Sequence, residues 1–263
     1  NHPKNTVGVS RNDIVVYTLR IYNEGTRDAI AALVKDNIPA GLQFIPSDDL
    51  NKKYNWKMLD ENNNETTKVS EAKYVVTDYL SNSVIKAYDS TTMDTLDFKD
   101  VEVAFKVIAE ESTKNEITNY AQISKETDSN GNTIKDRDST PNEWIDGEDD
   151  QDTEIIKLKY FDLALQKWVS KAIVIEDGKE TISETGYNGH EDPEPVVKVE
   201  LHKKKLNDVT VKFGYGITII NEGDIPGYAK EITDYLPEGL TFVKIDESSN
   251  SNWQTTSKEG DSV

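Results

Sequence analysis

One phrase occurs twice in the chain and determines how the chain is organised. Residues 17–44 read YTLRIYNEGTRDAIAALVKDNIPAGLQF, and residues 215–242 read YGITIINEGDIPGYAKEITDYLPEGLTF. The copies stand 198 residues apart without a gap, and 11 of 28 positions are identical. Each copy holds an alternating strand, an Asn-Glu-Gly turn, a second extended run, an aspartate and a Pro-x-Gly-Leu corner before a third strand. A repeat of this length indicates an array of like modules, and its parts predict an all-β protein.

The rest of the chain predicts where the two modules meet. Residues 101–107 alternate apolar and polar side chains, as a half-buried strand does. Residues 126–154 differ, because eleven acids and two bases fall there with little apolar periodicity. We therefore expect a first β-sandwich module over residues 1–125, an acidic linker over 126–154 and a second module over 155–263.

Charge and cysteine content narrow the classes of partner and stabiliser. The net charge is −19 and the isoelectric point is near 4.6, which disfavours nucleic acid and anionic membranes as partners. The chain has no cysteine, so a secreted protein of this sequence needs a stabiliser other than disulfides. It has no apolar run of membrane-spanning length, and its opening residues, NHPKNTVGVS, are not typical of a signal peptide. We expect any signal peptide and anchor to lie outside this stretch.

The acidic linker allows two interpretations. A charge run of this kind is usually a solvated connection. It also carries oxygen ligands of the type that calcium prefers, on a stretch that turns at Gly131. The candidate metal ligands are Asp128, Asn130, Asn132, Asp136 and Asp138. The helix-loop-helix calcium pattern is not met, and both interpretations remain open.

Polar residues also stand where the strand pattern predicts burial: Lys167, Asn119 and, in the two copies of the repeat, Asp36 and Asp234. One interpretation is ordinary: the lysine extends its amine to the strand end, and the aspartates cap turns. The other is a self-formed isopeptide bond. A desolvated lysine loses its proton and becomes a nucleophile, while a buried, protonated aspartate polarises the asparagine side chain. The amine then displaces ammonia, and the resulting crosslink replaces the missing disulfides.

Several phrases together resemble a known class of surface module. FDLALQKW, DIVVYTLRIYNEG, YAKEITDYLPEGL, ITNYAQIS and DRDSTPNE are similar to the isopeptide-forming fimbrial and adhesin-stalk domains of Gram-positive bacteria, over nearly the whole chain. The resemblance implies Ig-like sandwiches with a lysine in the first strand, an aspartate in a middle strand and an asparagine in the last strand. It assigns these roles to Lys167, to Asp36 and Asp234, and to Asn119.

The order of these residues departs from the pattern of that class. The first copy begins after the place of its lysine strand, and the second stops before the place of its asparagine strand. We therefore expect a first module that lacks its first strand, a second module that lacks its C-terminal strands, and no crosslink within this stretch. The alternative is that the strand with Lys167 folds back, or swaps between molecules, to complete the first module.

These observations predict a non-catalytic stalk or adhesin segment of a cell-wall-attached, extracellular protein, whose partners are neighbouring modules of the same protein. The alternative is an adhesin module that binds a host protein or glycan. Trp56 and Trp253 could stack on sugars or simply cover a sandwich edge. No enzyme is expected, because the sequence has no nucleophile elbow, phosphate loop or dinucleotide fingerprint. No cofactor is required, and calcium is the one candidate.

Overall fold

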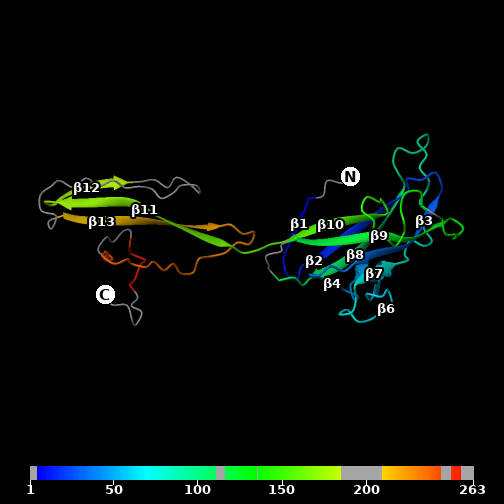
Figure 1. Ribbon diagram of the computed structural model, residues 1–263, viewed down its shortest axis with the longest axis horizontal. Helices are drawn as coiled ribbons and strands as arrows, with labels where there is room; N and C mark the ends of the chain where they lie inside the picture. The colour runs from blue at the N-terminus through cyan, green and yellow to red at the C-terminus, as the bar shows by residue number, and fades with distance from the viewer. Residues whose placement is uncertain (1–4, 111–115, 135, 185–208, 244–249, 256–263) are drawn as a thin grey trace. The chain divides into compact units, whose positions relative to one another are not determined.

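The chain forms two compact units, and in the described residues their regular secondary structure is β-strand apart from one short helix (Figure 1). The computed structural model describes residues 5–110, 116–134, 136–184, 209–243 and 250–255. The first unit comprises Asn1–Asp162 and Asn221–Ile225, and the second comprises Leu163–Ile220 and Pro226–Val263. The predicted all-β fold is confirmed. None of the helices in the described ranges is long and apolar enough to cross a membrane.

The first unit contains two sheets. The larger has the strand order β1-β10-β9-β3-β7-β5-β6, and the smaller has the order β2-β8-β4. Strand β1 runs parallel to β10, and the other described strand pairs in these sheets are antiparallel. The elements are β1 (Val7–Val9), β2 (Ile14–Tyr22), β3 (Ala29–Asn37), β4 (Leu42–Phe44), α1 (Asp49–Lys53), β5 (Lys57–Leu59), β6 (Glu65–Thr66), β7 (Tyr74–Thr77), β8 (Phe98–Val107), β9 (Glu116–Asp128) and β10 (Gln151–Leu158).

The two sheets of the first unit enclose one hydrophobic core. The smaller sheet contributes the inward side chains of β8, which alternate as the sequence predicts; Val101, Val103, Phe105 and Val107 are completely buried. The larger sheet contributes apolar side chains from β3, β7, β9 and β10 to the same cluster. Burying each large aliphatic or aromatic side chain contributes roughly 1.5–3 kcal/mol. The predicted β-sandwich is therefore present in this unit.

The acidic segment belongs partly to the first sandwich, which corrects the expected module boundaries. Strand β9 continues to Asp128, and β10 begins at Gln151 and pairs antiparallel with it. The outer ends of the expected linker, 126–154, thus lie in paired strands. The inward side chains Ile156 and Leu158 are buried in the first core. Strand pairing and apolar burial hold β10 in the first unit, so the division falls after Asp162, not after residue 154.

The second unit contains a three-stranded sheet with the order β12-β11-β13. Its strands are β11 (Leu163–Glu176), β12 (Lys179–Glu184) and β13 (Val209–Asn221). The second extended run of the repeat is not a strand here, although the sequence predicts one: residues 226–243 are described without strand structure. In the first copy the matching strand, β3, is paired on both sides, by β7 and β9.

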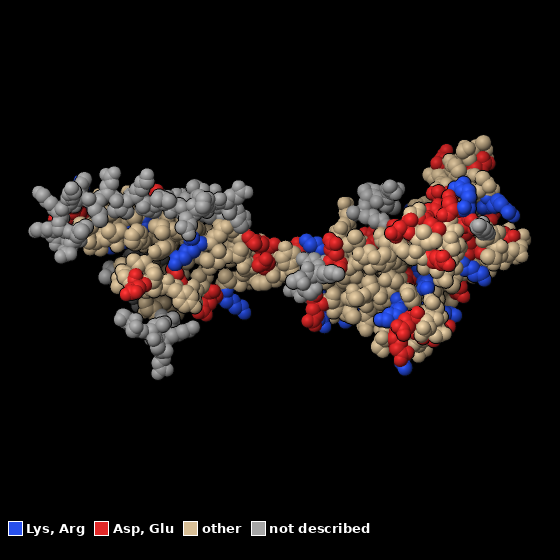
Figure 2. Space-filling view, viewed as in Figure 1, with Lys and Arg blue, Asp and Glu red and all other residues tan. Residues whose placement is uncertain are grey.

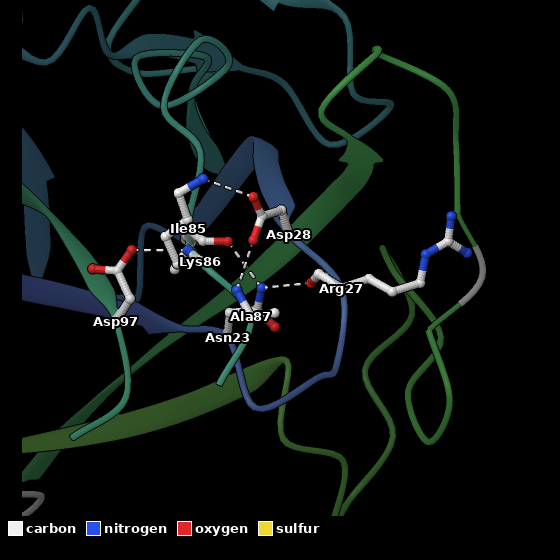
Figure 3. Close-up of polar contacts among 7 residues, drawn as sticks. All are labelled: Asn23, Arg27, Asp28, Ile85, Lys86, Ala87 and Asp97. Carbon is white, nitrogen blue, oxygen red and sulfur yellow. Dashed lines mark hydrogen bonds and ion pairs between the residues drawn. The ribbon is translucent and has the colours of Figure 1, made fainter. Parts of the chain in front are cut away.

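The Asn-Glu-Gly turn has the same geometry in both copies of the repeat. In the first copy, the Asn23 side-chain oxygen accepts from Gly25 N–H at 2.9 Å, and its Nδ2 donates to the carbonyl oxygens of Arg27 and Ile85 (Figure 3). In the second copy, Asn221 accepts from Gly223 N–H at 3.0 Å and donates to the Ile225 carbonyl oxygen at 3.0 Å. The asparagine thus satisfies the main-chain groups that the turn leaves unpaired.

The Pro-x-Gly-Leu corner also recurs. Leu42 N–H donates to the Pro39 carbonyl oxygen at 3.0 Å, and Leu240 N–H donates to that of Pro237 at 3.1 Å. The glycines between them have φ angles of +102° at Gly41 and +87° at Gly239. Only glycine adopts this region without steric cost. The corner therefore explains why both copies carry glycine at this position.

Candidate functional site

The interior of the first sandwich holds a contact between two predicted site residues. Asp36 lies on β3 and has no exposed surface, and Asn119 lies on the adjacent strand β9 and is 2% exposed. The Asn119 Nδ2 group donates to Oδ1 of Asp36 at 2.7 Å and to the Asn37 carbonyl oxygen at 3.0 Å. The antiparallel pairing of β3 with β9 brings these residues together, although they stand 83 positions apart.

The buried environment changes the acid strength of Asp36. Burial raises the pKa of this carboxyl well above its usual range, and the hydrogen bond from Asn119 only partly opposes the effect. The neutral, protonated form is therefore favoured, because a buried charge without a cation is costly. The second carboxyl oxygen, Oδ2, is buried and has no hydrogen-bond partner. In the protonated form, the carboxyl of Asp36 carries a proton that it can donate to a neighbouring group.

Tyr17 is a further member of this site that the sequence reasoning missed. Its hydroxyl group is buried and has no hydrogen-bond partner. Burial, followed by the charges of Asp36 and Glu154, raises the pKa of this hydroxyl, so it stays protonated. The available signal was the repeat itself, because tyrosine opens both copies, at Tyr17 and Tyr215.

The second unit holds the other half of the predicted set. Lys167 lies on β11, and its Nζ is 2.5 Å from Oδ1 of Asp234. The same ammonium group lies over the ring of Tyr215, which is on β13, 4.5 Å from the ring centroid. The Lys167 and Asp234 side chains are 33% and 27% exposed, so this pair is less enclosed than Asp36 with Asn119.

The repeat relates these two half-sites residue by residue. At the offset of 198 residues, Asp36 corresponds to Asp234 and Tyr17 corresponds to Tyr215. The first aspartate contacts an asparagine and the second contacts a lysine. Among the described residues, neither unit joins all three residue types of the predicted Lys–Asp–Asn set.

The predicted metal ligands separate into two groups. The side-chain oxygens of Asp128 accept hydrogen bonds from the main-chain N–H groups of Asn130 and Asn132 and from the Asn132 side chain, at 2.9–3.0 Å. This aspartate therefore closes its own turn. Asp136 and Asp138 instead lie with Asp149, and one carboxylate oxygen from each falls within 4.8 Å of the others. Asp128 does not belong to that group of carboxylates.

The surface gives limited support to carbohydrate stacking. Trp56 is 8% exposed and donates from its indole nitrogen to the Glu102 carbonyl oxygen at 2.7 Å. It therefore covers the sandwich core, as one of the two interpretations holds, and Trp253 is half-buried. On the face of the first unit seen in Figure 2, acidic and basic side chains are interspersed among other residues.

Comparisons with known proteins give one structural similarity. No protein-family model matches the chain, and no curated protein matches it in sequence. The crystal structure of BcpA, the major pilin subunit of Bacillus cereus, is similar with a TM-score of 0.28 and 10% sequence identity. The similarity covers 86% of this chain and 57% of that pilin chain. At this low TM-score, the function proposed below rests on the residues of this chain alone.

Proposed function

We propose that this chain is a non-catalytic stalk segment of a Gram-positive cell-surface or pilus-like protein, built to be tied by Lys–Asn isopeptide bonds. The observation that carries the proposal is the pairing of equivalent aspartates with complementary partners. Asp36 contacts the electrophile, Asn119, at 2.7 Å, and Asp234 contacts the nucleophile, Lys167, at 2.5 Å. The repeat makes the two aspartates equivalent. A lysine and an asparagine beside the same aspartate would therefore form the complete reactive set.

The chemistry follows from burial. A lysine brought beside Asp36 would be desolvated, so its amine would favour the neutral, nucleophilic form. Its Nζ attacks Cγ of Asn119 and forms a new C–N bond. The bond from Cγ to Nδ2 breaks, and one proton passes from the amine through Asp36 to the leaving nitrogen, which departs as ammonia. The products are one amide crosslink and one ammonia, and Asp36 is regenerated.

The first unit has room for a strand that would bring such a lysine. Strand β2 is an edge of the smaller sheet, whereas its counterpart in the second copy, β13, is paired with the lysine strand β11. A groove of about 450 Å³ lies between β1, β2 and β10, and Tyr17 and Glu154 line it. Tyr17 is the counterpart of the tyrosine that Lys167 covers. These features support a neighbouring module or a second molecule as the source of the lysine strand.

The stalk function follows from what the crosslink would do. A bond from a first strand to a last strand carries force through covalent bonds, while hydrogen bonds alone would separate under load. It also supplies the stabilisation that disulfides cannot give a chain without cysteine. Tandem modules of this kind extend a surface protein. We propose extracellular, wall-attached placement and neighbouring modules as partners on the same grounds.

Supplying the missing strand tests the proposal. A synthetic peptide of residues 160–170, YFDLALQKWVS, is incubated in excess with the chain, and the products are separated in denaturant. The expected product is a covalent adduct whose mass is the sum of both partners less one ammonia, about 17 Da. The Asn119→Ala chain and the peptide with Lys167→Arg should give none, while the control Asn130→Ala, in an exposed turn, should react normally.

A fusion of the peptide to the chain tests the same reaction when the free peptide binds weakly. The same eleven residues are joined through a flexible linker ahead of residue 1, so that the strand is present at high effective concentration. The fused chain should lose one ammonia without any partner. If neither the peptide mixture nor the fusion shows an ammonia loss, the isopeptide proposal is wrong.

A further inference from the structure

The smaller sheet of the first unit ends in a long strand that is paired on one side only. Strand β2 has nine residues, IVVYTLRIY, and pairs with β8 in an unbroken antiparallel register, while the described part of the chain places no strand on its other side. The other edge strands of this unit, β1, β4 and β6, have three residues or fewer. Proteins commonly protect an edge with proline, lysine or a bulge, because its free main-chain groups can pair with another strand. Strand β2 contains no proline or lysine, and no bulge interrupts its register.

The pairing of β2 with β8 determines which main-chain groups face the free edge. Val107 N–H donates to the Asp13 carbonyl oxygen at 2.9 Å, and Asn23 N–H donates to that of Asp97 at 3.3 Å. Asp13 and Asn23 flank β2 and bear odd numbers, and main-chain groups alternate between the two sides of a strand. The even-numbered residues of β2 therefore direct their N–H and C=O groups to the free edge. Each of them offers one donor and one acceptor to another strand.

The sequence of β2 is complementary to itself when two copies run antiparallel about Thr18. Residues directly opposite each other in such a pair lie on the same face, so the core-facing side chains of both copies stay on the core-facing side. These inward pairs are apolar: Val15 with Ile21, and Tyr17 with Leu19. The outward pairs are Ile14 with Tyr22, Val16 with Arg20, and Thr18 with its own copy.

The charge that β2 carries does not oppose this pairing. Arg20 binds Asp100 of its own chain through two hydrogen bonds of 2.9 Å, and its guanidinium lies 4.0 Å from the ring centroid of Phe98. In the antiparallel register each Arg20 stands opposite Val16, so the two guanidinium groups do not face each other. Ile14 and Val16 are 59% and 48% exposed, and a second strand would remove part of this apolar surface from water.

We propose that β2 is a dimerisation edge, at which a second copy of this chain pairs its own β2 antiparallel, with Thr18 opposite Thr18 on a two-fold axis. The pairing joins the smaller sheets of the two copies into one continuous sheet. Because a two-fold contact uses the same surface on both copies, the assembly closes at two. The inward side chains of the added strand would face the groove of about 450 Å³ beside β2, which Val9, Tyr17 and Ile156 help to line.

The dimer and the lysine strand would use the same edge, so they are alternatives. A chain without a lysine strand would keep β2 paired with a second copy, and an excess of lysine strand would separate the copies. The dimer itself needs neither a lysine nor an asparagine. A chain that does not dimerise would therefore leave the isopeptide proposal standing, and a chain that forms no peptide adduct would leave the dimer standing.

Sedimentation equilibrium of the whole chain measures the dimer. The wild type should form a reversible dimer whose affinity rises about threefold or more between about 20 and about 300 mM sodium chloride, because salt screens the repulsion between two chains of net charge −19. Thr18→Lys sets two ammonium groups opposite each other and should weaken the dimer at least tenfold. Gln43→Lys adds the same charge at an exposed position of β4, the other edge of the same sheet, and should dimerise as the wild type does.

Cysteine substitution tests the register, because the chain has no cysteine of its own. Only the residue on the two-fold axis meets its own copy, and directly opposite residues lie within the Cα separation of roughly 4.4–6.8 Å that a disulfide spans. Thr18→Cys should therefore give a disulfide-linked dimer under mild oxidation with copper phenanthroline, as followed on non-reducing gels. Val16→Cys, on the same face of the strand, should crosslink at least tenfold more slowly. Equal rates for the two variants, or a wild type that stays monomeric at about 100 μM, would overturn the proposal.

Discussion

Asp36 lies at the centre of the first sandwich, where its carboxyl group meets Asn119 and has no exposed surface. Burial raises the pKa of this carboxyl well above that of an exposed aspartate, whose pKa is about 4. Between those two pKa values the folded chain holds one proton that the unfolded chain has released. Stability therefore falls as the pH rises from about 4 toward the folded pKa, with a slope of about 1.4 kcal/mol per pH unit.

Asp36→Asn tests this residue, because its amide mimics the protonated carboxyl in shape and hydrogen bonding. The variant should match the wild type near pH 4 and be more stable near pH 8, as measured by urea unfolding followed through the fluorescence of the buried Trp56. It should also form no peptide adduct, since an amide cannot carry the proton to the leaving nitrogen. A variant less stable than the wild type at pH 8 would contradict the raised pKa.

Asp60→Asn is a control at an aspartate whose pKa is shifted in the opposite direction to that of Asp36. Main-chain and side-chain hydrogen bonds from Asn64, and the main-chain N–H of Asn62, lower the pKa of the half-buried Asp60. A lowered pKa contributes stability above the unfolded pKa that is lost as the pH falls. This variant should therefore be no more stable than the wild type at neutral pH.

The turn that follows the first strand of each copy allows a matched comparison at the scale of the element. Asn23 is 8% exposed and donates to two carbonyl oxygens, those of Arg27 and Ile85. Asn221 is exposed and donates to one, that of Ile225. Asn23→Ala should cost about 1–3 kcal/mol, because the Ile85 carbonyl loses a buried bond, and Asn221→Ala should cost less. Equal losses in urea unfolding would show that burial does not set the strength of this turn.

The corner glycines form a second matched pair. A Cβ atom added at Gly41 would lie 2.8 Å from Cδ1 of Ile117, whereas one added at Gly239 would meet nothing within 4 Å. Both positions carry the strain of a positive φ, which costs about 1–2 kcal/mol for alanine. Gly41→Ala should lower the free energy of unfolding by more than this, and Gly239→Ala by this amount or less. A smaller loss at Gly41 than at Gly239 would refute the packing account of the corner.

Elements with strong periodicity were predictable, and short elements were not. The alternation in β2 and β8 indicated their buried faces, because one face of each strand packs into the core. The five-residue helix α1 has no such period. Asp48 caps it by accepting from Leu50 N–H at 2.9 Å, and its last turn carries Lys52 and Lys53. The capping residue and the charges at its ends determine whether so short a helix forms. In the sequence, both features are also typical of a polar loop.

At the scale of the whole chain, the repeat predicted two like modules but misplaced the division between them. The acid-rich composition of 126–154 indicated a linker, yet the strand partners of β9 and β10 decide where the first unit ends. Pairing between distant strands is invisible to local composition. The same limit applies to the site. The predicted burial holds for Asp36 and Asn119 but not for Lys167, whose side chain is 33% exposed, and the sequence did not indicate that the charge of Asp36 would act on Tyr17.

Under the proposed chemistry, the two half-sites hold complementary parts of one reaction, and neither described unit holds all of them. The first unit supplies a protonated aspartate and an asparagine, and the second supplies a lysine beside the equivalent aspartate. A stalk made of such modules would become covalent wherever a lysine strand pairs with the edge that β2 presents. The proposed bond joins Nζ of that lysine to Cγ of Asn119.

Fragment mass spectrometry of the adduct between the chain and the 160–170 peptide tests that claim most directly. After proteolysis, the account predicts a branched product in which the peptide lysine is joined to Asn119, with one ammonia lost, and no such product from Asp36→Asn. An unmodified Asn119 in every fragment, or a linkage at any other residue, would contradict it.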